Sequence, residues 1–196
     1  MEQVTKLINT LRDQLKLGRY RLMLGWVLGI IIVVFASHLP SVLGMVIFFA
    51  GCLVRFWSNG CIRKNEVLAT DGPYRFTRNP LYVGSFLMIF GAALSVLAWW
   101  LALIFGLIFL IIYYDEILKE EKNLLEIFGE AYQDYMKKVP RFFPLPWQYL
   151  PHNKQAEPPF SWQQAIKNRG YEAFAMMLLF YVGVVAVVWL KHKIGI

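Results

Sequence analysis

Two polar stretches in an otherwise apolar chain contain the residues whose types and spacing could do chemistry. The first runs from Asp71 to Gly84 and places Arg75 and Arg78 just before Asn79 and Pro80. An Asn followed by a Pro predicts an N-cap and the first residue of a helix. Two guanidinium groups at a helix start can bind an anionic group such as a carboxylate. The alternative interpretation is a helix start that the arginines anchor at a membrane surface.

The second stretch, residues 115–129, predicts an amphipathic helix with carboxylates on its apolar side. At about 100° per residue, Glu121 lies in the middle of the apolar face and Glu120 at its edge. A carboxylate in this position is costly unless a cation or hydrogen-bond donors meet it. Glu121 therefore either pairs with Arg78 or Arg75 as a structural ion pair, or faces a ligand cavity and holds positive groups there. We expect the second. The apolar face is formed by Ile117, Leu124, Leu125 and Phe128, and the opposite face by Lys119, Lys122, Asn123 and Glu126.

The composition of the chain is that of a membrane protein. Of its 196 residues, 58% are hydrophobic, and the mean hydropathy is +0.46. The net charge of +7 does not indicate nucleic-acid binding, because the basic residues flank apolar segments. Cys52 lies in an apolar run, so a disulfide with Cys61 is not expected. His38, His152 and His192 are scattered without metal-ligand spacing, so no metal site is predicted.

Five apolar runs predict an all-α integral membrane protein with about five transmembrane helices. The runs pair into two helical hairpins and a C-terminal span, and a cytoplasmic amphipathic helix follows the fourth run, with Gly129 dividing it into two pieces. No cleavage site follows the first run, so we interpret it as an anchor. The runs are Leu22 to Leu39, Val42 to Trp57, Leu81 to Leu97, Ala98 to Tyr114, and Ala173 to Leu190. The predicted regions are an amphipathic lead-in (1–21), a membrane core (22–146), a Pro-rich cytoplasmic connector (147–171) and a terminal helix (172–196).

The distribution of Lys and Arg predicts the orientation. If the five helices alternate, 18 of the 20 basic residues fall on one side, and Lys191 and Lys193 lie opposite. Positive residues accumulate on the cytoplasmic side of membrane proteins. The N-terminus and both polar stretches are therefore expected to face the cytoplasm. Arg55, near the cytoplasmic end of the second run, is expected to extend toward lipid headgroups.

The two polar stretches together resemble a known family. The segment from Arg78 to Tyr82 is followed, one helical hairpin later, by Glu120-Glu121 and by the segment from Phe128 to Phe142. This pattern is similar to that of the isoprenylcysteine carboxyl methyltransferases and the related phospholipid methyltransferases, and covers roughly residues 42–146. The resemblance implies S-adenosylmethionine as methyl donor, bound on the cytoplasmic side. It also implies a lipophilic acceptor from the membrane, such as a prenylated peptide, a lipid amine or an isoprenoid acid.

The resemblance also assigns residues. Where the carboxyl methyltransferases have His, this chain has Asn79, which cannot act as a base at neutral pH, so we expect Asn79 to orient the cofactor and not to carry a proton. Arg78, Arg141 or Arg55 would meet an anionic acceptor. The implied cofactor contacts are Tyr74, Arg78, Asn79, Pro80, Tyr82, Gly84, Glu120, Glu121, Phe128 and Tyr132, and the implied catalytic residues are Arg78, Glu121 and Arg141.

Two other functions remain open from the sequence. One is an NADPH-dependent membrane reductase related to the sterol reductases, whose cofactor end is similar in outline. The other is a non-enzymatic carrier or assembly protein, in which Glu121 pairs structurally. A soluble Rossmann-type methyltransferase is excluded, because no GxGxxG motif follows a predicted strand.

Overall fold

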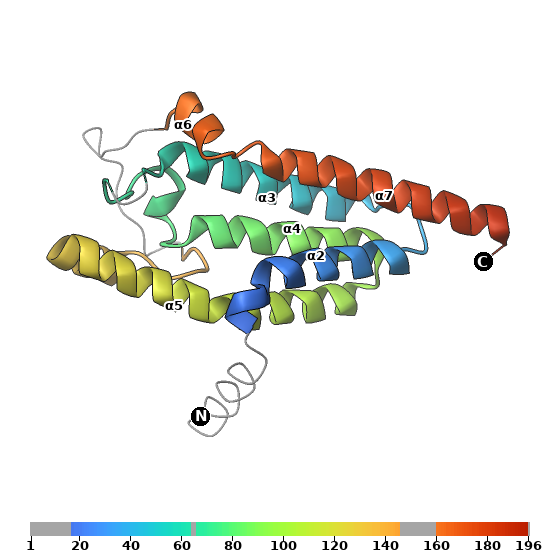
Figure 1. Ribbon diagram of the computed structural model, residues 1–196, viewed down its shortest axis with the longest axis horizontal. Helices are drawn as coiled ribbons and strands as arrows, with labels where there is room; N and C mark the ends of the chain where they lie inside the picture. The colour runs from blue at the N-terminus through green and yellow to red at the C-terminus, as the bar shows by residue number, and fades with distance from the viewer. Residues whose placement is uncertain (1–16, 64–65, 146–159, 196) are drawn as a thin grey trace, which may run out of the picture.

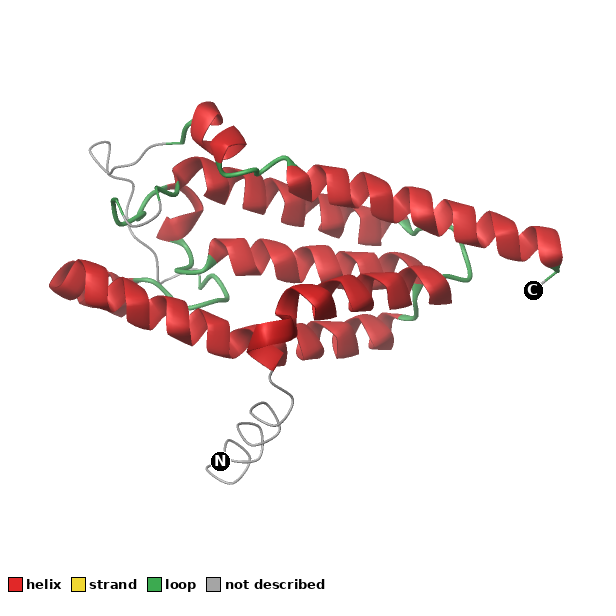
Figure 2. Ribbon diagram, viewed as in Figure 1, coloured by secondary structure: helices red, strands yellow, loops and turns green. Residues whose placement is uncertain are grey.

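The computed structural model describes residues 17–63, 66–145 and 160–195, with side chains from residue 26 onward, and these form a bundle of long helices (Figure 1). Regular secondary structure in these ranges is helical (Figure 2), which confirms the predicted all-α architecture. The predictions for the lead-in and for most of the Pro-rich connector fall on residues 1–16 and 146–159, outside the described residues. The elements are α2 (Leu17–Phe35), α3 (Val42–Cys61), the 3₁₀ turn η1 (Gly72–Arg75), α4 (Pro80–Val96), α5 (Trp99–Lys138), α6 (Trp162–Lys167) and α7 (Glu172–Ile194).

A helix lies at each of the five predicted apolar runs. Three of them, α3, α5 and α7, are long and apolar enough to cross a membrane. Helix α4 and the apolar part of α2 (Trp26–Phe35) are also apolar but shorter. The structure thus supports a membrane protein, and the count of five spans stays a prediction.

Among the described helices, α3 and α4 make the most extensive contact. Glycines face each other across this contact. A Cβ on Gly51 would lie 2.7 Å from the carbonyl oxygen of Gly84, and one on Gly84 would lie 2.6 Å from Cγ of Arg55. Small residues allow helix backbones to approach closely in membranes, where van der Waals packing drives association. The α3–α4 contact is therefore a closely packed part of the fold.

The first predicted hairpin is not a packed pair. Helix α2 makes its main contacts with α4, α5 and α7 instead of its neighbour α3, because α3 uses its small-residue face for α4. The connection after α2 is held by Ser41, whose backbone N–H donates to the Ser95 carbonyl at 2.8 Å. From α7, Lys191 donates to the carbonyls of Val34 and Ala36 at 2.8 and 3.0 Å and so caps the end of α2. The second predicted hairpin, α4 with α5, does pack together.

Helix α5 joins two elements that the sequence pattern predicted as separate. The fourth apolar run and the amphipathic segment form one helix from Trp99 to Lys138. The backbone departs from helical geometry at Gly129, with φ 53° and ψ −126°, as the predicted division into two pieces requires. This conformation is accessible essentially to glycine only. The kink sets the direction of the last turns of α5, which carry Tyr132 and Tyr135.

Helix α6 fastens the polar end of α3. The Asn168 side-chain amide donates to the carbonyls of Asn59 and Ile62 at 2.8 and 3.0 Å, and the Ser161 N–H donates to the Gly60 carbonyl at 3.0 Å. These bonds satisfy carbonyls that a helix end leaves without partners. They also fix the start of the loop that leads to η1.

Candidate active site

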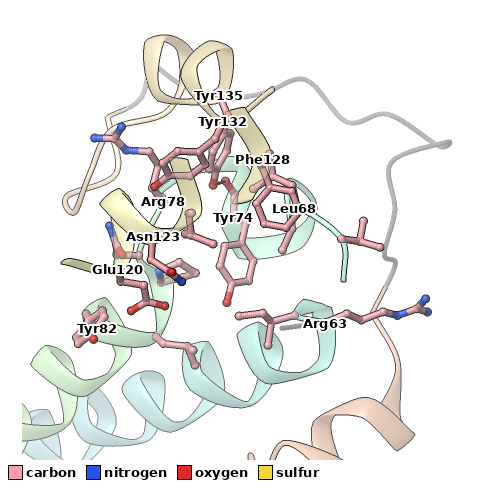
Figure 3. Close-up of a pocket in the computed structure, with 17 residues that line it drawn as sticks. Arg63, Leu68, Tyr74, Arg78, Tyr82, Glu120, Asn123, Phe128, Tyr132 and Tyr135 are labelled. Atoms are coloured by element: carbon pink, nitrogen blue, oxygen red, sulfur yellow. Dashed lines mark hydrogen bonds between the residues drawn. The ribbon is translucent and has the colours of Figure 1, made fainter. Parts of the chain in front are cut away.

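Four segments enclose a cavity of about 180 Å³ at one end of the bundle. They are the loop around Leu68, the turn η1, the start of α4 and the second half of α5 (Figure 3). Its wall is part polar and part aromatic, as in many small-molecule sites. The residues that line it include Arg63, Leu68, Tyr74, Arg78, Asn79, Pro80, Leu81, Tyr82, Glu120, Asn123, Phe128, Tyr132 and Tyr135.

Backbone bonds hold η1 and α4 against the end of α5. Gly72 begins η1 with φ 59°, and a Cβ there would lie 2.7 Å from Sγ of Cys61, so the turn requires glycine. The Tyr135 hydroxyl donates to the Tyr74 carbonyl at 2.7 Å, and the Arg78 N–H donates to the Pro140 carbonyl at 2.9 Å. Segments about 60 residues apart in the chain are thereby joined at the cavity.

Glu121 lies at the centre of a buried polar network and not on the cavity wall. Its carboxylate accepts a hydrogen bond from Arg141 Nε at 2.9 Å and another from Asn79 Nδ2 at 3.1 Å. Arg78 Nε lies 3.3 Å from the carboxylate as an ion-pair partner. The structure thus forms the ion pair with Arg78 that was the alternative interpretation of the sequence. The Arg75 guanidinium lies 5.5 Å from the Phe76 ring centre.

Asn79 occupies the predicted N-cap position before Pro80, but its side chain makes no capping bond. Its amide instead donates to Glu121 and to the Arg141 carbonyl, at 3.1 and 3.0 Å. Thr77 donates to the same carbonyl at 3.2 Å. Asn79 therefore ties the α4 start to the segment after α5, which requires only an amide donor and no titratable ring.

Glu120 is the carboxylate that borders the cavity. It is exposed at the cavity side of α5, close to Tyr82 and Asn123 (Figure 3). The prediction that Asn123 lies on the opposite face was wrong, because Asn123 also lines the cavity. Asn123 lies three residues after Glu120, and residues at this spacing share a helix face, so the spacing from Glu120 was the signal that could have found it.

Tyr74 contributes a buried hydroxyl to the cavity. Its side chain is 6% exposed, and within the described residues its hydroxyl has no hydrogen-bond partner. Burial, with Glu120 adding to the effect, raises the pKa of the Tyr74 phenol far above its usual range. The phenol is therefore a neutral donor at physiological pH, directed into the cavity (Figure 3).

Besides Glu121, the predicted site residues Gly84 and Arg141 also lie away from the cavity wall. Gly84 packs on α3, against Gly51 and Arg55, and is not part of the wall. Arg141 reaches the site through Glu121, and its guanidinium also lies 5.9 Å from the ring centre of Tyr114. The other predicted contacts, Pro80, Tyr82, Phe128 and Tyr132, line the wall.

Arg55 does not extend toward headgroups. Its Nη1 donates to the Leu81 carbonyl at 3.2 Å and to the Ser85 hydroxyl, both on α4. The side chain is half-buried between the two helices. Gly84 has no side chain, and this leaves room for the Arg55 side chain between the two helices.

Comparisons with known proteins agree with the resemblance seen in the motifs. A family profile described as phospholipid methyltransferase matches residues 21–131, more than half of the chain. Among curated relatives, the protein-S-isoprenylcysteine O-methyltransferase of Schizosaccharomyces pombe is 37% identical over 82 residues, or 42% of this chain and 35% of that protein. The cobalt-zinc-cadmium resistance protein CzcN of Cupriavidus metallidurans is 34% identical over 110 residues, or 55% and 50%.

A third relative, the methanethiol S-methyltransferase of Crocosphaera subtropica, is 37% identical over 75 residues, or 38% of this chain and 28% of that protein. The chain thus spans between about a quarter and a half of the length of these relatives. No solved structure matches the chain. The profile match, the apolar helices and the placement of both motifs at one cavity show that the chain is a membrane protein of the phospholipid methyltransferase family.

Proposed function

We propose that the protein transfers a methyl group from S-adenosylmethionine to a lipophilic acceptor at the cytoplasmic face of the membrane. The observation that carries this proposal is the cavity bordered by the Arg78-to-Tyr82 segment and by Glu120. The family match and the names of the relatives support methyl transfer as the reaction class. The basic loops support the cytoplasmic side.

The residues that line the cavity are suited to bind part of an S-adenosylmethionine molecule. Glu120 and Asn123 offer oxygens for its positive groups, and Phe128 and Tyr132 offer aromatic faces. The unpartnered Tyr74 hydroxyl offers a donor. The cavity is smaller than the roughly 300–1,000 Å³ typical of ligand pockets, so it matches one portion of the molecule. When bound, S-adenosylmethionine supplies a methyl group on a sulfonium, which a nucleophile can attack directly.

The chain's own residues would then act by binding and positioning. Glu120 holds positive charge beside the cavity. Glu121 acts differently, because it fixes Arg78, Asn79 and Arg141 relative to one another, so that the wall of the cavity is preorganised. Fixed orientation of the reactants can account for roughly 7–11 kcal/mol of a barrier. Methyl transfer therefore does not depend on a proton carrier at Asn79.

The acceptor is proposed to be lipophilic, since the cavity lies at the end of helices whose outer surfaces are apolar. Two of the three relatives named above act, by their names, on an isoprenylcysteine and on methanethiol. An isoprenoid carboxyl or a lipid amine both fit this class. The family match does not favour the NADPH-dependent reductase.

A transfer assay tests the proposal. Purified protein in lipid nanodiscs is incubated with methyl-labelled S-adenosylmethionine and a membrane lipid extract, and label is measured in the organic phase. We expect label to enter the lipid fraction with wild-type protein, and about ten-fold less label with Glu120→Gln at limiting donor concentration. Equal labelling with and without the protein would contradict the proposal.

A further inference from the structure

The Tyr74 hydroxyl is an unused hydrogen-bond donor in a site that is otherwise well connected. It is buried, and no group within the described residues bonds to it. It projects from η1 into the cavity, on the side where α3 and α4 pass (Figure 3). A buried hydroxyl without a partner is unfavourable, and a ligand oxygen in the cavity would remove that cost.

Arg55 is an uncompensated cation close to the same place. Its two described hydrogen bonds both start from Nη1 and end on neutral groups, the Leu81 carbonyl and the Ser85 hydroxyl. None of the ion pairs found in the described part of the chain includes Arg55. A guanidinium carries five N–H donors, so two bonds leave it capacity for more.

The surroundings of Arg55 connect it to the cavity. Leu81, which accepts its hydrogen bond, is itself a wall residue. The titratable groups whose fields act on Arg55 are Cys52, Tyr113, Glu172 and Tyr74. Glu172 already pairs with Arg169. Cationic side chains within membrane helices generally mark ligand or ion sites.

A phenol donor and a nearby guanidinium favour an oxyanion and disfavour an amine. We propose that Tyr74 and Arg55 form a carboxylate-binding site on the α3–α4 side of the cavity. Tyr74 donates the hydrogen bond, and Arg55, which is hydrogen-bonded to the carbonyl of the wall residue Leu81, supplies the positive charge. This assignment rests on the proposed function, in which two molecules carry a carboxylate, namely the methyl donor and an acidic acceptor. Glu120, also on the wall, provides the opposite charge that a zwitterionic amino-acid group needs.

Two pairs of probes separate these sources. The first pair is S-adenosylhomocysteine and its decarboxylated analogue, and the second is farnesoic acid and farnesol. Each pair differs at the carboxylate. Binding is measured by calorimetry on the full-length protein in detergent, with wild type, Tyr74→Phe and Arg55→Met. The control is Tyr181→Phe, which also removes a buried tyrosine hydroxyl but lies on α7, away from the cavity.

With wild type, we expect one pair to show about ten-fold tighter binding of the carboxylate form. Tyr74→Phe should remove most of that preference while its melting temperature stays unchanged or rises, and Tyr181→Phe should keep the preference. The pair that responds identifies the source. Arg55→Met should remove the preference as well. If Arg55→Met does not fold, Tyr74→Phe decides alone.

A preference that survives in Tyr74→Phe or in a folded Arg55→Met, or the absence of a preference in both pairs with wild type, would overturn the assignment. Failure of the proposed function looks different. In that case S-adenosylhomocysteine does not bind wild-type protein at all, and the farnesoic acid pair still decides whether Tyr74 and Arg55 bind a carboxylate.

Discussion

At the level of single residues, the adjacent carboxylates of α5 have different surroundings. Glu121 is 5% exposed and contacts two guanidinium groups and an amide, whereas Glu120 is exposed beside the cavity. A buried carboxylate with such partners stabilises the fold only as long as all of them remain. Glu121 is therefore expected to act on stability, and Glu120 on ligand binding.

The first prediction concerns Glu121→Gln. The change keeps the shape of the side chain but leaves the charge of Arg78 buried without a counter-charge, since Arg78 is only 9% exposed. We expect the free energy of unfolding to fall by about 3 kcal/mol. Thermal unfolding in detergent without ligand measures this. The matched control is Glu120→Gln, which should melt close to wild type; a Glu121→Gln protein as stable as wild type would show that the network contributes little.

At the level of elements, the kink of α5 directs the aromatic end of that helix over the cavity. Gly129 adopts a glycine-specific conformation, yet a Cβ there would meet nothing within 4 Å. The requirement for glycine is therefore one of backbone conformation alone.

The second prediction follows from this. Gly129→Ala should lower the free energy of unfolding by about 1–3 kcal/mol, because alanine must adopt a strained φ and ψ. Gly29→Ala is a matched control, since Gly29 lies inside α2 with equal open space. It should be neutral or stabilising by up to about 1 kcal/mol. Two alanine variants of equal stability would contradict the conformational argument.

Part of this arrangement could be predicted from the sequence. Periodicity and apolar runs located the helices, and Gly129 located the kink, because these signals are local. The sequence pattern did not predict that α5 is one continuous helix. The residues change from apolar to polar near Tyr114, and such a change marks where a helix leaves an apolar environment but does not end the helix. The pairing of α2 with α4, α5 and α7 was missed because α3 packs its glycines against α4, and a contact between distant segments leaves no local signal in the sequence.

The site was predictable to a similar extent. Both motifs meet at one cavity, as the resemblance implied. The partners of Glu121 were not predictable in full, because Arg141 and Asn79 approach it from 20 and 42 residues away in the chain. Arg55 points toward α4 because Gly84 leaves space for it, and the spacing of apolar residues in the sequence does not predict such a space.

At the level of the whole molecule, the third prediction is that the cavity end of the bundle faces the cytoplasm. It rests on the distribution of Lys and Arg. His38 is exposed at the α2–α3 connection, and Gln133 is exposed on the last part of α5. Single cysteines at positions 38 and 133 should react with a membrane-impermeant maleimide from opposite sides of the membrane. Native Cys52 and Cys61 are buried and give a low background. Labelling of both positions from one side would contradict the topology.

Calorimetric titration of the purified protein with S-adenosylhomocysteine tests directly whether this cavity binds the methyl donor. We expect saturable binding to wild type and roughly ten-fold weaker binding to Glu120→Gln, which corresponds to the loss of about one charged hydrogen bond, at unchanged melting temperature. NADPH should give no binding heat. Absence of binding to wild type at millimolar S-adenosylhomocysteine, or equal affinity for wild type and Glu120→Gln, would contradict the assignment of this cavity.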